Sequence, residues 1–364
     1  MTSNNHVTLC SIIRGIVTIL VGSLFVTSNP AASSASASAS ITSYFNGPAA
    51  IIVSGTHIWV ANETGDSLTE LNAMNGSVMR VIDSPVDHFV APCALAISDN
   101  NLWVANYKSH SVTELNASNG ALVRVIDAPS DRLGNPSAIA AAGTQVWVVN
   151  ATGQSVTELN ASNGSLQRII EPSVGRFATP DSIAVNGTSV WVTNFSDDSS
   201  ARPFRSSISE LDASTGKLVR FIDANRFKLA GSGGIAVNAG KVWVANSFAL
   251  GFGGGVTEIN ASTGQLLKVI QGPPLTPISP LAIGVSGKHI WVVNLEGAPV
   301  TEIDAQTGTL VRELVSKEAD LSGATSIAIS GSKVWVVNFK NNSLTEFDGN
   351  SGNLIRVVKG GFSR

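Results

Sequence analysis

Few side chains in this sequence are suited to catalysis, and histidine is the most informative of them. After the first forty residues the chain contains four histidines: His57, His88, His110 and His289. His88 and His110 fall in loops of the same kind, where two imidazoles could act as an acid–base pair. No serine-hydrolase, zinc-protease or phosphate-loop motif is present. We therefore predict no catalytic site, and His88 and His110 are the only candidates for one.

A second set of side chains is basic and recurs at long, regular intervals. His88, Arg132, Arg176 and Lys228 follow one another at spacings of 44, 44 and 52 residues. Cations at equivalent positions can hold a carboxylate or an acidic or sulfated glycan through charge-assisted hydrogen bonds. The candidate ligand-binding residues are His88, Arg132, Arg176, Lys228, Arg202 and Arg205.

The alternative interpretation of this basic set is structural. These residues would then be solvated linker side chains, paired with nearby acids such as Asp87, Asp131 or Asp181. Surface ion pairs of this kind contribute little to stability.

Metal and cofactor sites are not indicated. Cys93 is the only cysteine after residue 40, so neither a thiolate metal cluster nor an internal disulfide can form there. Asp197 and Asp198 lack the alternating oxygen-ligand spacing typical of a calcium loop. We predict no metal and no cofactor.

Composition limits the range of partners. Hydrophobic residues make up 43% of the 364 residues, charged residues 13%, and the formal net charge is −3. There is no run of lysine or arginine, which argues against nucleic acid and anionic membrane surfaces as partners. We expect a monomer that binds a small molecule, a glycan or a protein.

Residues 1–39 have the order of a secretory signal. A polar start containing Arg14 precedes the apolar run "GIVTILVGSLFV", and the small-residue segment "AASSASASAS" follows. An uncleaved anchor is the alternative, but twelve apolar residues are short against the roughly 20 of a membrane-spanning helix. We predict a protein that is secreted or located in the periplasm or cell envelope, with no membrane span in the mature chain.

The rest of the chain is one motif written seven times. The seven tryptophans are separated by 44, 44, 44, 52, 48 and 44 residues. Asn follows each tryptophan by three residues, and Glu, Gly and a basic residue recur after it at distances that are the same in every repeat except the fourth and fifth. The tryptophans are Trp59, Trp103, Trp147, Trp191, Trp243, Trp291 and Trp335.

Each repeat contains four short apolar runs separated by turn residues. In the third they are "SAIAAA", "QVWVVN", "SVTELN" and "LQRII", and an Asn-Gly turn joins the last two. We therefore predict that residues 40–364 form one all-β domain, a seven-bladed β-propeller with four antiparallel strands per blade. Rows shared by all blades are structural in this interpretation, with the tryptophans packed between blades. A register uncertainty of one residue leaves it open whether the Glu and Arg rows pair.

The repeats differ from one another mainly in their loops. Blade four carries an insertion inside "FSDDSSARPFRSS" and blade five one inside "SFALGFGGG". Both lie between the second and third strands, on the same face as the blade-to-blade linkers and the basic set. We predict that this loop-rich face is the recognition surface. His57 and His289 would be exposed strand-start residues on the opposite face.

The repeat resembles known bacterial propeller repeats. "VWVVN" stands where the YVTN-type repeat has its Tyr-Val-Thr-Asn strand, and "LDASTGKLVR" resembles the docking segment of pyrroloquinoline-quinone-type propellers, which has tryptophan where Arg220 stands. The resemblance implies a propeller fold. It leaves the activity open, because such propellers serve as enzymes, binding proteins and structural modules.

Three functions follow from this pattern. The preferred one is an exported, non-enzymatic binding or interaction protein that uses its loop-rich face, with an anionic ligand. The alternatives are a lyase similar to the virginiamycin-B-type lyases, using His88 and His110 with a divalent metal, and a structural module of the cell envelope. The Trp-Phe-Thr strand of those lyases does not occur in this sequence.

Overall fold

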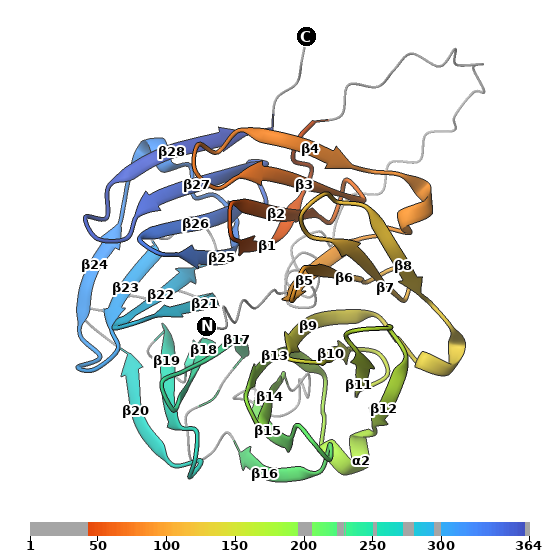
Figure 1. Cartoon of the computed structure of the whole chain (residues 1–364). Helices are drawn as coiled ribbons and strands as arrows, with labels where there is room; N and C mark the ends of the chain where they lie inside the picture. The colour runs from red at the N-terminus through yellow and green to blue at the C-terminus, as the bar shows by residue number, and fades with distance from the viewer. Residues whose placement is uncertain are drawn as a thin grey trace, which may run out of the picture.

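The computed structural model describes residues 43–195, 206–223, 229, 231–249, 253–271, 280–294 and 300–360. These residues form seven four-stranded antiparallel sheets arranged in a ring (Figure 1). Within each sheet the strand order follows the sequence, with the first strand nearest the centre and the fourth at the rim. The predicted seven-bladed β-propeller is thus confirmed.

The strands of the first four blades have closely matched lengths. Blade 1 contains β1 (Pro48–Ser54), β2 (His57–Asn62), β3 (Ser67–Asn72) and β4 (Val78–Ile82). Blade 2 contains β5 (Pro92–Ser98), β6 (Asn101–Asn106), β7 (Ser111–Asn116) and β8 (Leu122–Ile126). Blade 3 contains β9 (Pro136–Ala142), β10 (Gln145–Asn150), β11 (Ser155–Asn160) and β12 (Leu166–Ile170). Blade 4 contains β13 (Pro180–Asn186), β14 (Ser189–Asn194), β15 (Ser207–Asp212) and β16 (Leu218–Asp223).

The last three blades follow the same plan, with two longer strands in blade 5. Blade 5 contains β17 (Ser232–Asn238), β18 (Lys241–Ala249), β19 (Gly253–Asn260) and β20 (Leu266–Gln271). Blade 6 contains β21 (Pro280–Ser286), β22 (His289–Asn294), β23 (Val300–Asp304) and β24 (Leu310–Leu314). Blade 7 contains β25 (Ala324–Ser330), β26 (Lys333–Asn338), β27 (Ser343–Asp348) and β28 (Leu354–Lys359). The helical turns are η1 (Pro85–Asp87), η2 (Pro129–Asp131), α2 (Pro172–Gly175) and η3 (Lys317–Ala319).

This connectivity gives the ring two different faces. The loop-rich face carries the loops between second and third strands, such as 107–110, and the blade-to-blade linkers, such as 83–91. The hairpin face carries the turns between first and second strands, such as 55–56, and between third and fourth strands, such as 73–77.

The tryptophan row packs between neighbouring blades, as predicted. Trp147 of blade 3 lies in one buried cluster with Ile183, Val190 and Leu211 of blade 4. Trp335 of blade 7 likewise packs against Ile51 of blade 1, so the same contact closes the ring. All seven tryptophans are at most 2% exposed. Burial of an aromatic side chain removes roughly 150–250 Å² of surface from water. The tryptophan row therefore contributes a large part of the contact that holds neighbouring blades together.

The Glu and Arg rows pair within the outer hairpin of every blade except the fifth, which settles the register. Glu158 lies opposite Arg168, and a β-bulge between Glu158 and Leu159 accommodates one extra residue on β12. Arg168 Nε lies 2.6 Å from Glu158 Oε2. The other pairs are Arg80–Glu70, Arg124–Glu114, Arg220–Glu210, Arg312–Glu302 and Arg356–Glu346.

These glutamates are buried, and burial changes their acidity. Desolvation raises the pKa of Glu114, Glu158, Glu210 and Glu302 above the usual range, although the facing arginine in each blade acts in the opposite direction. In blade 5, where Lys268 replaces arginine, Glu258 pairs with Lys241 at 2.6 Å.

The same arginines also bind the next blade. Arg168 Nη2 donates to the carbonyl oxygen of Ser214 in the blade 4 turn at 2.9 Å, and Arg356 of blade 7 donates to Asn75 of blade 1. The turn glycines make room for this contact: Gly216 has φ 69°, and a Cβ there would lie 2.9 Å from Arg168 Cδ. Because blade 7 uses the same bonds as the others, the ring closes without an exchanged strand.

The asparagine row joins the second and third strands to the linkers. Asn150 Nδ2 donates to Ser155 Oγ and Thr157 Oγ1 at 3.2 and 2.9 Å, and Thr157 Oγ1 donates to the carbonyl oxygen of Asp131 at 3.1 Å. All three side chains are buried. This row therefore fixes each linker on its blade and is explained by folding alone.

Candidate functional site

Three of the predicted binding residues occupy equivalent places on the loop-rich face. His88, Arg132 and Arg176 each follow a helical turn, η1, η2 or α2, and have φ values of 55°, 49° and 54°. Left-handed conformation is uncommon outside glycine, so three successive linkers repeat one specific backbone shape. All three residues are exposed. The structure therefore confirms that they are at equivalent, accessible positions.

Two of these three cations have a carboxylate partner. Arg132 forms a two-pronged ion pair with Glu171, in which Nη2 lies 3.3 Å from Oε2. His88 Nδ1 lies 3.6 Å from Asp127 Oδ2. The acids are the first residues of the following linkers, and not the Asp87, Asp131 or Asp181 that the sequence suggested. An incoming anion at either position has to compete with an acid of the protein.

Asp87 and Asp131 instead end the helical turns η1 and η2 within these linkers, and both are buried. Burial raises the pKa of Asp87, the neighbouring carboxylate of Asp83 adds to the effect, and His88 acts in the opposite direction. The backbone carbonyl of each acid is hydrogen-bonded to the blade. Thr113 Oγ1 donates to the carbonyl oxygen of Asp87 at 2.6 Å, and Thr157 Oγ1 donates to the carbonyl oxygen of Asp131 in blade 3. These acids therefore shape the linkers.

Arg176 has a different partner. Its guanidinium carbon lies 3.7 Å from the centre of the Phe221 ring, and no ion pair joins Arg176 to an acid among the residues that the structure describes. A guanidinium stacked on an aromatic ring has its face covered, whereas its N–H groups point outward in the plane and can bind a carboxylate or sulfate. Arg176 is therefore the predicted residue best arranged for an anion.

Phe221 was missed by sequence reasoning, although the repeat contained a signal. It is the fourth residue of β16, a position at which the other blades have no aromatic side chain. The equivalent residues are Val81, Val125, Ile169, Val269, Glu313 and Val357. The signal is weak, because the exchange replaces one apolar residue by another within a strand and changes neither the charge nor the length of the repeat. The aromatic ring occurs in the same blade as the longest insertion.

His110 has a structural role. Its Nδ1 accepts the backbone N–H of Asn135 in the next linker at 3.0 Å. At the equivalent positions Asp66 Oδ1 accepts from Ala91 at 2.7 Å, and Asn342 Oδ1 accepts from Gly47 at 2.7 Å. His110 thus accepts the same backbone hydrogen bond between adjacent blades that an Asp or Asn side chain accepts elsewhere in the ring. His88 and His110 have different partners, and only His110 belongs to a row whose members make the same bond in several blades.

The remaining predicted ligand-binding residues, Arg202, Arg205 and Lys228, lie outside the described residues, as does most of the blade 4 insertion. Within the described part of the chain, no group of three or more His, Cys, Asp and Glu side chains is arranged to hold a metal ion. Among those residues there is also no helix of the length and apolar character that a membrane crossing requires.

His57 and His289 are strand-start residues on the hairpin face, as predicted, but they are not simply exposed. Each is only partly exposed and places Nδ1 2.5 Å from a buried carboxylate, Glu70 or Glu302. The pair forms because strand-start residues lie across the ladder from the residues that end the third strand, close to the Glu row.

Comparisons with known proteins identify the fold. No family model and no curated protein sequence matches this chain. Among solved structures, Kuenenia stuttgartiensis hydrazine synthase superposes with a TM-score of 0.67 at 16% identity, over 83% of this chain and 95% of that chain. The dihydro-heme d1 dehydrogenase NirN in complex with DHE gives a TM-score of 0.57 at 17% identity, over 85% of this chain and 66% of that one.

A third similar structure comes from the nidogen/laminin complex, with a TM-score of 0.52 at 16% identity, over 71% of this chain and 93% of that chain. At these identities the similarity shows a shared propeller fold and no more. The neighbours include both enzymes and binding proteins.

Proposed function

We propose that this chain is an exported, non-enzymatic propeller of the YVTN repeat type that binds an anionic ligand on its loop-rich face. The observation that carries the proposal is the Arg176 guanidinium, exposed and stacked 3.7 Å above Phe221. The ring restricts the guanidinium in orientation, so less conformational freedom is lost when an anion binds.

Neighbouring linkers support the same ligand class. Arg132 and His88 extend the line of cations over two further blades, where the ligand would displace exposed acids. A repeating anion, such as an acidic or sulfated glycan, suits cations repeated from blade to blade. The role of His110 as a link between blades accounts for a histidine that an enzymatic hypothesis would otherwise use.

The test uses the chain without residues 1–39 and two probes, a heparin hexasaccharide and an oligogalacturonate, in titration calorimetry. Arg176→Gln is expected to weaken binding about tenfold, the equivalent of one charge-assisted hydrogen bond. Phe221→Val installs the residue that four other blades have, and is expected to weaken binding less. Binding is also expected to fall as salt rises.

The matched control is Lys217→Gln, which removes one exposed cation from the hairpin face. It is expected to change the affinity less than about twofold, because a distant surface charge is screened by salt. Equal affinities of wild type and Arg176→Gln, or no binding of either probe to the folded wild type, contradict the proposal.

A further inference from the structure

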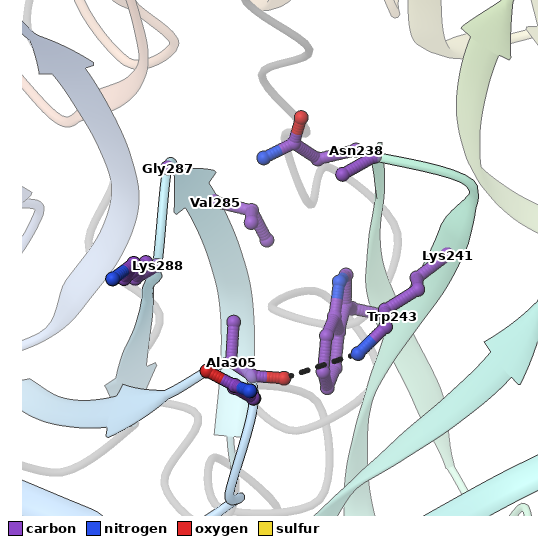
Figure 2. A pocket seen from close by; sticks show the side chains of 9 residues that line it. Asn238, Lys241, Trp243, Val285, Gly287, Lys288 and Ala305 are labelled. Atoms are coloured by element: carbon purple, nitrogen blue, oxygen red, sulfur yellow. Dashed lines mark hydrogen bonds between the residues drawn. The ribbon is translucent and has the colours of Figure 1, made fainter.

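A small cavity lies on the hairpin face between blades 5 and 6, on the opposite side of the ring from Arg176. Its volume is about 150 Å³, and it is formed by the β17–β18 hairpin of blade 5 and by the turns of blade 6 (Figure 2). It is independent of the proposed function, because none of its residues belongs to the loop-rich face.

The inner part of this cavity is apolar. Val285 and Ala305 are half-buried and line it, and the Trp243 indole, 1% exposed, closes its inner end. An apolar cavity of roughly 150 Å³ is large enough for a benzene-sized molecule. The apolar part of a ligand is therefore limited to about one ring.

The rim of the cavity is cationic, and its two lysines differ. Lys241 Nζ is held 2.6 Å from Glu258 Oε1, donates to the carbonyl oxygen of Ala305 at 3.3 Å and lies 5.3 Å from the Trp243 ring centre (Figure 2). Its charge is thus already balanced. Lys288 is exposed and has no ion-pair partner among the described residues. The net positive charge at this rim comes from Lys288, whose ammonium points away from Val285 and Ala305 in Figure 2 and reaches the cavity by rotation about its side-chain bonds.

Lys288 is also a departure from the repeat. It occupies the last position of the turn between first and second strands, where the other blades have no charged side chain. The equivalent residues are Thr56, Asn100, Thr144, Thr188, Gly240 and Ser332. Folding therefore does not require a lysine here. The Asn238 side chain, a further donor, stands on the facing hairpin (Figure 2).

We infer that this cavity binds a small planar carboxylate with an apolar body of one ring. The ring contacts Val285, Ala305 and Trp243, and the carboxylate accepts from the Lys288 ammonium and the Asn238 amide. A lone ammonium at the edge of an apolar cavity provides the charge and the orientation that such a ligand requires.

The test measures benzoate binding by calorimetry and ligand-observed NMR, with benzamide and acetate as the uncharged and ringless comparisons. Benzoate is expected to saturate one site, with the other two at least about tenfold weaker. Lys288→Thr, which installs the residue of three other blades, is expected to weaken benzoate about tenfold. The control Lys217→Thr removes a lysine from the same face and is expected to change affinity less than about twofold.

A second variant tests the cavity itself. Ala305→Val places a larger side chain in the cavity and is expected to abolish benzoate binding, whereas Ala117→Val at the equivalent position of blade 2 leaves it intact. Thermal unfolding of both variants establishes that they are folded. The inference is overturned if benzoate does not saturate, if benzamide binds equally well, or if folded Ala305→Val binds like wild type. Weaker benzoate binding in Arg176→Gln would place the ligand on the loop-rich face and also overturn it.

Discussion

Arginine and glutamate form ion pairs in two regions of this ring, and the pairs of the two regions differ in how far they are exposed to solvent. On the outer hairpin of blade 3, Arg168 pairs with Glu158, which is 2% exposed. On the loop-rich face Arg132 pairs with Glu171, and the two side chains are 53% and 40% exposed. Only in the second case can water replace the lost partner for both side chains, because Glu158 of the first pair has almost no access to solvent. Burial, and not residue type, therefore separates the ion pairs that belong to the folded core of this chain from those that remain accessible at its surface.

The buried side of this comparison predicts its largest effect at the tryptophan row. Trp147→Ala is expected to lower the free energy of unfolding by about 3–5 kcal/mol, because it leaves a cavity between blades 3 and 4. Urea unfolding followed by circular dichroism measures the loss. The control Val174→Ala removes a 48% exposed side chain from a linker and is expected to change little. A Trp147→Ala variant as stable as wild type would contradict inter-blade packing.

A smaller loss is expected when the buried ion pair is broken. Glu158→Ala is expected to cost about 3 kcal/mol, near the low end for a broken buried pair, since Arg168 remains 32% exposed and reaches water. Glu158→Gln is expected to cost less than Glu158→Ala. It keeps an acceptor for Arg168, and burial, which raises the pKa of Glu158, already disfavours its charge. The order is read from urea midpoints; a Gln variant less stable than the Ala variant would contradict it.

The fold was predictable from the sequence because every blade repeats the same solution. Trp147, Asn150 and Gly164 recur in all seven repeats, and each has a contact with a neighbouring strand or blade that explains its presence. The pairing of Glu158 with Arg168 was not predictable, because the bulge at Leu159 shifts the register by one residue. A bulge depends on tertiary twist, which the local sequence does not determine.

The candidate site was only partly predictable, for a related reason. The positions of His88, Arg132 and Arg176 followed from counting along the repeat, but their partners did not. Asp127, Glu171 and Phe221 lie on the next linker or strand around the ring, so the contacts depend on the angle between blades. Lys288 gives no functional signal in the sequence, because a single changed turn residue is informative only when the structure places a cavity beside it.

Low pH is expected to destabilise the turns of some blades more than those of others, because the turn residue differs between them. Hydrogen bonds from Ser214 and Thr215 lower the pKa of Asp212 to about 2, below the value of about 3.9 for an unfolded chain. The resulting stabilisation is present above pH 3.9 and is lost as the pH falls through about 2. Blades 1, 2, 3 and 5 have asparagine at this position and gain no such dependence.

Replacing Asp212, Asp304 and Asp348 together by asparagine removes this titration, since hydrogen bonds lower the pKa of all three. The drop in melting temperature between pH 5 and pH 2.5 is expected to be smaller in the triple variant than in wild type. Calorimetric melting at the two pH values measures it, and an equal drop would show that these turns do not contribute to acid sensitivity.

The smallest effect on stability, and the one that bears most directly on function, is expected at the exposed pair. Glu171→Ala removes the acid that binds Arg132, and a surface pair contributes at most about 1 kcal/mol, so the variant is expected to unfold almost like wild type. Arg132 then faces solvent without its competitor. If the loop-rich face binds anions, heparin hexasaccharide is expected to bind Glu171→Ala roughly two- to fivefold more tightly than wild type, the equivalent of about 0.5–1 kcal/mol. Glu313→Ala, which removes an acid from an outer strand of blade 6, is the charge-matched control. The same gain in both variants would reflect net charge alone, and a loss of affinity in Glu171→Ala would mean that Glu171 orients Arg132 for the ligand instead of competing with it.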